Sequence, residues 1–116
     1  MSADQAGNRW RQERSTTVGK LVRDGIPAII EARGDVPSIR ILDAETYRTA
    51  LFDKLVEEAQ ELRDAPPKRR LEEAADVYEV LLAVVTELGV TLDDVAASAA
   101  TKRETRGGFE RRIWLD

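Results

Sequence analysis

Two pairs of acidic residues flank a Pro-Pro turn in the middle of the chain. The first pair is Glu58 and Glu61, the second is Glu73 and Asp76, and the i, i+3 spacing within each pair places both side chains on one face of a helix. The two pairs are centred equally far from residue 67, so two antiparallel helices joined there would bring them to the same height. Carboxylates that converge in this way repel one another and lose hydration, and a hard divalent cation with an octahedron of oxygen ligands removes that cost. The spacing therefore predicts a Mg²⁺ site, with Mn²⁺ as a possible substitute, held by all four side chains.

The composition restricts the chemistry that is open to such a site. The chain has 116 residues with no Cys and no His, which excludes disulfides, thiolate zinc sites, cysteine nucleophiles and imidazole acid–base catalysis. Carboxylates, Lys, Arg, hydroxyl groups and oxygen-binding metals remain. The net charge of −4 argues against a nucleic-acid polymer as partner. No apolar run is long enough to span a membrane, and we expect a cytoplasmic protein without membrane contacts.

An ordinary solvated surface is the alternative explanation of the acidic residues. Glutamates at helical spacing are common on charged helices, where they face water and pair with nearby cations. The basic residues available for such pairs are Lys54, Lys68, Arg69 and Arg70. The spacing alone does not separate this interpretation from a metal site.

A helix hairpin is expected to position the carboxylates. Asp43 is suited to cap a helix over residues 44–63, and residues 66–67 end it because Pro67 excludes the preceding residue from the α region. A second long helix is expected over residues 68–88, stopped by Gly89. Both helices carry apolar residues at helical spacing: Tyr47, Leu51, Phe52, Leu55, Val56, Ala59 and Leu62 in the first, and Leu71, Ala74, Ala75, Tyr78, Leu81, Leu82, Val85 and Leu88 in the second.

Shorter elements are expected on both sides of the hairpin. The sequence pattern predicts a short helix over residues 26–33. Thr91 can cap a third helix that reaches Glu104. Residues 37–42 and 109–115 are predicted to be short strands that pair as a two-stranded β-ribbon. The fold class is therefore mainly α, with the hairpin and the third helix forming a bundle beside a small ribbon.

The domain is expected to cover residues 18–116, after a disordered N-terminal extension over residues 1–17, which is polar and lacks an apolar stretch of signal-peptide length. A single hairpin with a small ribbon buries little apolar surface. We therefore expect a homodimer or a higher homo-oligomer in which helices of different protomers complete the bundle.

Three stretches carry a resemblance to a known family: KLVRDGIP at 20–27, the acidic segments at 58–61 and 73–76, and RGGF at 106–109. In this order they resemble the small house-cleaning branch of the MazG, or all-α nucleoside-triphosphate pyrophosphohydrolase, superfamily, whose members are phosphoribosyl-ATP pyrophosphohydrolase-like. The chain departs from that pattern at Gly25, where the family usually has Lys. The resemblance implies Mg²⁺-dependent hydrolysis of the α–β phosphate bond of a nucleotide, with the four carboxylates as metal ligands.

Further roles follow from this resemblance and from the spacing. Glu57, Glu58 and Glu61 are the expected catalytic residues, and Glu57 is either a further ligand, the group that orients or deprotonates the water, or only a helix-surface neighbour of Glu61. The basic residues expected to contact the substrate phosphates, or else to be plain surface charges, are Lys20, Arg23, Lys54, Lys102, Arg103 and Arg106.

The expected function is hydrolysis of a nucleoside triphosphate, which can be a non-canonical one, to the monophosphate and pyrophosphate. The alternatives are phosphoribosyl-ATP pyrophosphohydrolase of histidine synthesis and a non-catalytic helical module that acts through dimerisation or regulation.

Overall fold

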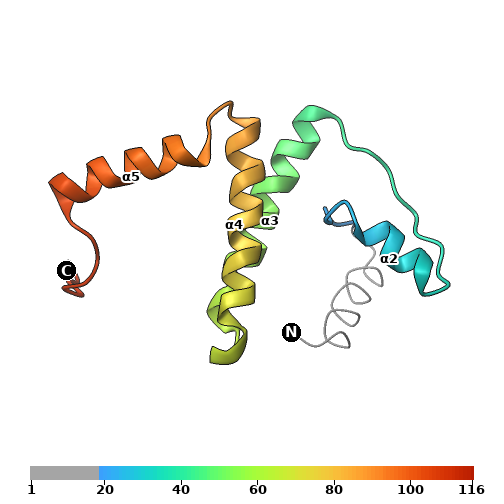
Figure 1. The fold of residues 1–116 in the computed structure, drawn as a ribbon, viewed down its shortest axis with the longest axis horizontal. Helices are drawn as coiled ribbons and strands as arrows, with labels where there is room; N and C mark the ends of the chain where they lie inside the picture. Colours follow the sequence, from blue (N-terminus) through green and yellow to red (C-terminus); the bar gives the residue numbers. More distant parts are fainter. Residues whose placement is uncertain (1–18) are drawn as a thin grey trace.

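The computed structural model describes residues 19–116, so the predicted extension at 1–17 lies outside the described residues (Figure 1). The described part contains four α-helices and one 3₁₀ turn: α2 (Ile26–Ala32), α3 (Ala44–Asp64), η1 (Pro67–Arg69), α4 (Arg70–Glu87) and α5 (Leu92–Arg106). This confirms the mainly α character expected from the sequence. None of the helices in this region combines the length and the apolar character that crossing a membrane requires.

The centre of the fold is the antiparallel hairpin of α3 and α4 (Figure 1). Ala65 is extended (φ −70°, ψ 143°) and leads into the Pro-Pro turn, where η1 connects the two helices. Leu51 of α3 and Val84 and Val85 of α4 are almost fully buried. The hairpin that the apolar spacing predicted is therefore the part of the chain that holds the core.

Asp43 begins α3 as a helix cap. Its carboxylate accepts a hydrogen bond from the backbone N–H of Thr46 at 2.8 Å, and this bond lowers the pKa of the Asp43 carboxyl below its ordinary value of 3.8. Because the folded-state pKa is the lower one, the cap stabilises the protein above pH 3.8, and this contribution is lost as the pH falls through the folded-state pKa.

We expect Asp43→Ala to lower Tm by a few degrees at neutral pH, because it removes the acceptor for an N–H group at the start of α3. Asp43→Asn should keep most of the stability at neutral pH, since its amide oxygen can accept the same bond. Thermal unfolding followed by circular dichroism at several pH values measures both variants. Equal melting of wild type and Asp43→Ala at neutral pH would contradict the capping role.

Helix α5 begins with a reciprocal cap and extends away from the hairpin. The side chain of Thr91 accepts from the N–H of Asp94 at 3.0 Å, and the carboxylate of Asp94 accepts from the N–H of Thr91 at 2.9 Å. Gly89, with φ +80°, ends the preceding helix. α5 has no buried residue and runs off to one side of α4 (Figure 1). The bundle predicted for the hairpin and α5 is therefore not formed within the described chain.

The predicted β-ribbon is wrong. Residues 37–42 and 109–115 adopt no strand or bridge in the described structure. Their apolar side chains are exposed, among them Ile39, Ile41 and Ile113. β-branched residues favour strands only where a neighbouring strand and a packing surface are present, and a two-stranded ribbon alone is marginal. Neither segment has such a surface in the described chain.

The hairpin has two different sides. On one side, four large apolar side chains are exposed: Phe52 and Val56 of α3, and Tyr78 and Leu82 of α4. Each of them comes directly after a residue that faces the other helix. Because the helices are antiparallel, residues placed in this way point to the same side of the hairpin, and they lie in pairs equally far from residue 67. We call these four residues, with Ala59 and Ala75 nearer the turn, the open apolar face.

Candidate metal and phosphate site

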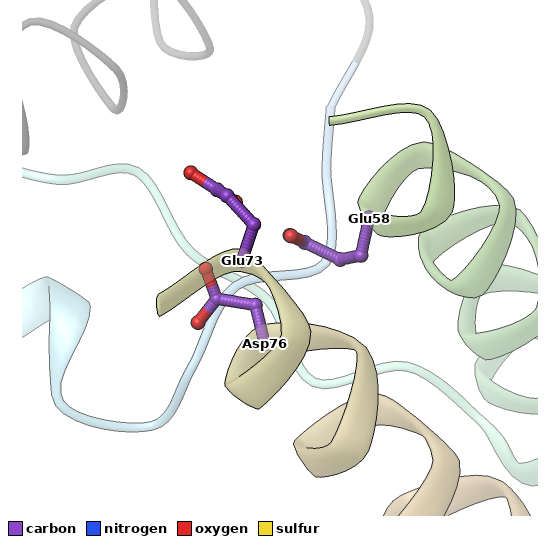
Figure 2. Close-up of side chains that lie close together, drawn as sticks. All are labelled: Glu58, Glu73 and Asp76. Carbon is purple, nitrogen blue, oxygen red and sulfur yellow. The ribbon is translucent and has the colours of Figure 1, made fainter. Parts of the chain in front are cut away.

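Three of the predicted ligands converge near the turn of the hairpin. Glu58 of α3 and Glu73 and Asp76 of α4 each offer a carboxylate oxygen within 4.8 Å of the other two (Figure 2). Glu58 enters the site from one helix and the other two residues come from successive turns of its neighbour. The register argument from the sequence expected these three side chains, together with Glu61, to meet at this height of the hairpin. We call them the carboxylate trio.

Two members of the trio are buried, which an ordinary solvated surface does not explain. Glu58 is 2% exposed and Glu73 is 3% exposed. Burial of charged groups is costly unless opposite charges and hydrogen bonds compensate it. Lys54 Nζ lies 3.5 Å from Glu58 Oε1, and Arg69 Nη2 donates to Glu73 Oε1 at 3.2 Å. The ion pairs that the solvated-surface alternative required at Lys54 and Arg69 are thus present, but at carboxylates that are withdrawn from water.

Two basic residues that precede α2 reach the same side of the hairpin. Arg23 Nη2 donates to Asp76 Oδ1 at 2.7 Å, and its Nη1 lies 3.9 Å from Glu79 Oε1. Lys20 Nζ donates to Glu57 Oε1 at 3.3 Å. These contacts place two of the predicted phosphate-binding cations beside the carboxylates. Glu79 was not identified from the sequence, although its i, i+3 spacing after Asp76 indicates that both carboxylates lie on the same face of α4.

The remaining glutamates of α3 lie at the edge of the trio. Glu57 is half-buried, with Lys20 at 3.3 Å on one side and Lys54 at 3.6 Å on the other. Glu61 is half-buried on the next turn of α3 and does not belong to the group whose oxygens lie within 4.8 Å. The structure therefore brings together three of the four predicted ligands and leaves Glu61 beside them.

Three other predicted phosphate-binding residues lie away from the trio. Lys102, Arg103 and Arg106 are exposed on α5, where they line a hollow with Gly107, Gly108 and Phe109. Lys102 lies about 15 Å beyond the start of α5, and Asp76 lies about 16 Å before the end of α4. Since α5 runs away from the hairpin at that end (Figure 1), these three cations do not reach the trio of the same chain.

The donor set of the trio fits a hard divalent cation. All three side chains offer oxygen, and the chain has no Cys or His to supply sulfur or imidazole nitrogen. Mg²⁺ and Mn²⁺ prefer carboxylate oxygens, and Mg²⁺ in proteins usually keeps several waters that a substrate phosphate can replace. Two ligands on α4 and one on α3 give such an ion a rigid base, because both helices are fixed by the hairpin core.

Comparison with known proteins supports this interpretation of the site. The family model described as phosphoribosyl-ATP pyrophosphohydrolase matches residues 28–103, which include α3, α4 and the whole trio. An uncharacterized protein from Mycolicibacterium smegmatis is 50% identical over 48 residues, which are 41% of this chain and 49% of that relative. The match thus spans about half of the relative's length. No solved structure matches the chain. The chain belongs to the phosphoribosyl-ATP pyrophosphohydrolase family, within the MazG-like all-α nucleoside-triphosphate pyrophosphohydrolase superfamily.

Proposed function

We propose that the chain is a Mg²⁺-dependent pyrophosphohydrolase that cleaves the α–β phosphate bond of a nucleoside triphosphate in the cytoplasm and releases the monophosphate and pyrophosphate. The observation that carries the proposal is the convergence of Glu58, Glu73 and Asp76 within 4.8 Å, two of them buried, inside the region that the pyrophosphohydrolase family model matches. Mn²⁺ fits the same donor set.

The trio and several of its neighbours have distinct roles in this proposal. A bound divalent cation would neutralise the charge of the phosphates and lower the pKa of a bound water. The trio would hold the cation, and Glu61 would assist from the next turn of α3. Glu57, which is half-buried and lies next to Lys20 and Lys54, would accept the proton of the attacking water. Lys20, Lys54 and Arg23 would supply positive charge to the phosphates at the same side of the hairpin.

Phosphoribosyl-ATP is the second candidate substrate, and the description of the matching family favours it. Its hydrolysis breaks the same bond and requires the same carboxylates. The two candidates share the triphosphate and differ in the rest of the nucleotide, so they would differ in the part of the site that contacts the base rather than at the trio. Complementation of a strain that lacks this step of histidine synthesis separates them.

We also propose that the protein functions as a homodimer. The described residues leave several large apolar side chains exposed on the hairpin, among them Phe52, Val56 and Tyr78. A contiguous exposed apolar surface of this kind is typical of an interaction site. The open apolar face is the part of the hairpin best suited to a second copy of the chain, because it is rigid and apolar and lies on the side opposite to Asp76 and Glu57.

The proposal is tested by measuring pyrophosphate release from common, deoxy and modified nucleoside triphosphates and from phosphoribosyl-ATP, with Mg²⁺ and with a chelator. We expect turnover of at least one substrate, only when the divalent cation is present. If no substrate is hydrolysed in a metal-dependent way, the enzyme assignment is wrong and the non-catalytic helical module replaces it.

Mg²⁺ alone should stabilise the protein, because a ligand that binds only the folded state shifts unfolding by mass action. At a free Mg²⁺ concentration of about one hundred times Kd, the gain is about 2.7 kcal/mol, and Tm should rise by about 10 °C. Thermal unfolding is followed across a Mg²⁺ titration, with Na⁺ at matched ionic strength as the control. A flat melting temperature would contradict the metal site.

A further inference from the structure

The segment that precedes α2 connects both helices of the hairpin on the side of the trio. Lys20 contacts Glu57 of α3, and three residues later Arg23 contacts Asp76 and Glu79 of α4. We call residues 19–25 the strap. Apart from its last residues, which turn into α2, the strap has no regular secondary structure, so its position depends on these ion pairs and on the half-buried side chains between them.

The contact between Arg23 and Asp76 involves a carboxylate of the trio. Arg23 Nη2 lies 2.7 Å from Asp76 Oδ1, and Asp76 is the most exposed member of the trio, with 22% of its side chain accessible. A cation bound by the trio would be coordinated by the Asp76 carboxylate. It would also repel the positively charged guanidinium group that is hydrogen-bonded to the same carboxylate. Arg23 and a divalent cation therefore compete for Asp76.

The other cations at the trio are held differently. Lys54 and Arg69 stand one helical turn before their carboxylates, and their side chains are 13% and 24% exposed. The side chain of Arg23 is 56% exposed and belongs to the irregular strap. It also has a second carboxylate within reach, since Glu79 lies at 3.9 Å on the next turn of α4 and is half exposed. Arg23 is therefore the most exposed of the three cations and stands on irregular backbone, so it can leave Asp76 more easily than Lys54 and Arg69 can leave their carboxylates.

We propose that Arg23 is an exchangeable counter-charge, which neutralises Asp76 until a divalent cation displaces it and then turns to the substrate phosphate. This inference rests on the proposed function, because it requires a metal at the trio. It assigns to Arg23 two successive partners, a carboxylate in the metal-free protein and a phosphate in the loaded enzyme. Guanidinium groups bind both types of oxyanion with the same donor geometry.

The first test is isothermal titration calorimetry with Mg²⁺ in the absence of nucleotide. Arg23→Ala should bind Mg²⁺ roughly three- to tenfold more tightly than wild type, because the competing charge is gone. Arg23→Lys should lie between the two. Arg48→Ala is the matched control, since Arg48 is 55% exposed and pairs with Glu87 of α4 at 3.5 Å, away from the trio; its Mg²⁺ affinity should equal that of wild type.

Equal or weaker Mg²⁺ binding by Arg23→Ala overturns the exchange while leaving the metal site in place. Absence of Mg²⁺ binding by the wild type overturns the metal site and the exchange together, so the two failures are distinguishable. A general loss of structure in the variant does not imitate the expected result, because unfolding weakens metal binding instead of strengthening it.

A second measurement follows Arg23 directly. Its side-chain Nε–H resonance, identified by its loss in Arg23→Lys, should shift during a Mg²⁺ titration with the same midpoint as the calorimetry, whereas the Arg48 resonance should stay in place. In the enzyme assay, Arg23→Ala should raise KM for the nucleotide by about tenfold although it binds Mg²⁺ more tightly. An unshifted Arg23 resonance, or an unchanged KM, contradicts the proposal.

Discussion

Glu73→Gln is expected to reduce the rate of pyrophosphate release by about a thousandfold, because the neutral amide cannot replace a buried carboxylate as a ligand of a divalent cation. Glu73 is 3% exposed and lies within 4.8 Å of Glu58 and Asp76, so its carboxylate faces the position that the cation would take. The variant should also lose most of its Mg²⁺ affinity. Steady-state kinetics and calorimetry measure the two effects separately.

The stability of Glu73→Gln should change little. The substitution weakens the pair with Arg69, whose Nη2 lies 3.2 Å from Glu73 Oε1, but it also relieves the repulsion between Glu73 and the other two carboxylates. We expect a Tm within a few degrees of the wild type without metal. Glu72→Gln is the matched control, since Glu72 precedes Glu73 on α4 and is exposed; it should keep full activity. If Glu73→Gln is inactive because it is unfolded, the carboxylate of Glu73 has a structural role rather than a metal-binding one.

The second large effect is expected on assembly. Val56→Lys places a charge in the middle of the open apolar face, between Phe52 on the preceding turn of α3 and Tyr78 at the same height on α4. If a second copy of the chain covers this face, the buried ammonium group should cost about 3 kcal/mol and weaken dimerisation by about two orders of magnitude. Light scattering after size exclusion, from 1 to 100 µM protein in roughly tenfold steps, measures the change.

The same substitution at Val36 controls for the chemical change itself. Val36 is 92% exposed and lies in the irregular link between α2 and α3, whereas Val56 is 58% exposed on the hairpin. Val36→Lys should dimerise like the wild type. Both variants should keep the helical content of the wild type, because Val36 lies outside the helices and Lys favours helices at least as well as Val at position 56. A wild type that remains monomeric at about 100 µM would exclude a stable dimer, because the Kd would then lie above that concentration.

The parts of the fold that the sequence predicted are those governed by local chemistry. Asp43 caps α3 and Thr91 caps α5 because their side chains reach N–H groups only three residues away. The Pro-Pro turn at 66–67 ends α3 through the restricted backbone of proline. The turn also sets the register, and for this reason Glu58, Glu73 and Asp76 could be expected to meet before the structure was known.

The parts that the sequence did not predict depend on contacts between distant segments. Ile39 and Ile41 have strand propensity, but they find no neighbouring strand in the described structure and remain exposed. Arg23 carries no positional signal for its pairing with Asp76, because the strap is irregular and its path is set by the whole fold. Lys102 appeared to belong to the phosphate site through its motif, yet α5 carries it away from the trio.

The irregular link over residues 33–43 has a consequence for how quickly the strap can respond. It joins the strap and α2 to α3 through a short tether, so a strap that lets go of the hairpin remains within a few nanometres of it. At that range, the effective concentration of the strap near the carboxylates is millimolar, and rebinding requires no diffusion from bulk solution. The exchange of Arg23 between its two proposed partners can therefore recur while the hairpin stays folded and the strap stays close to it.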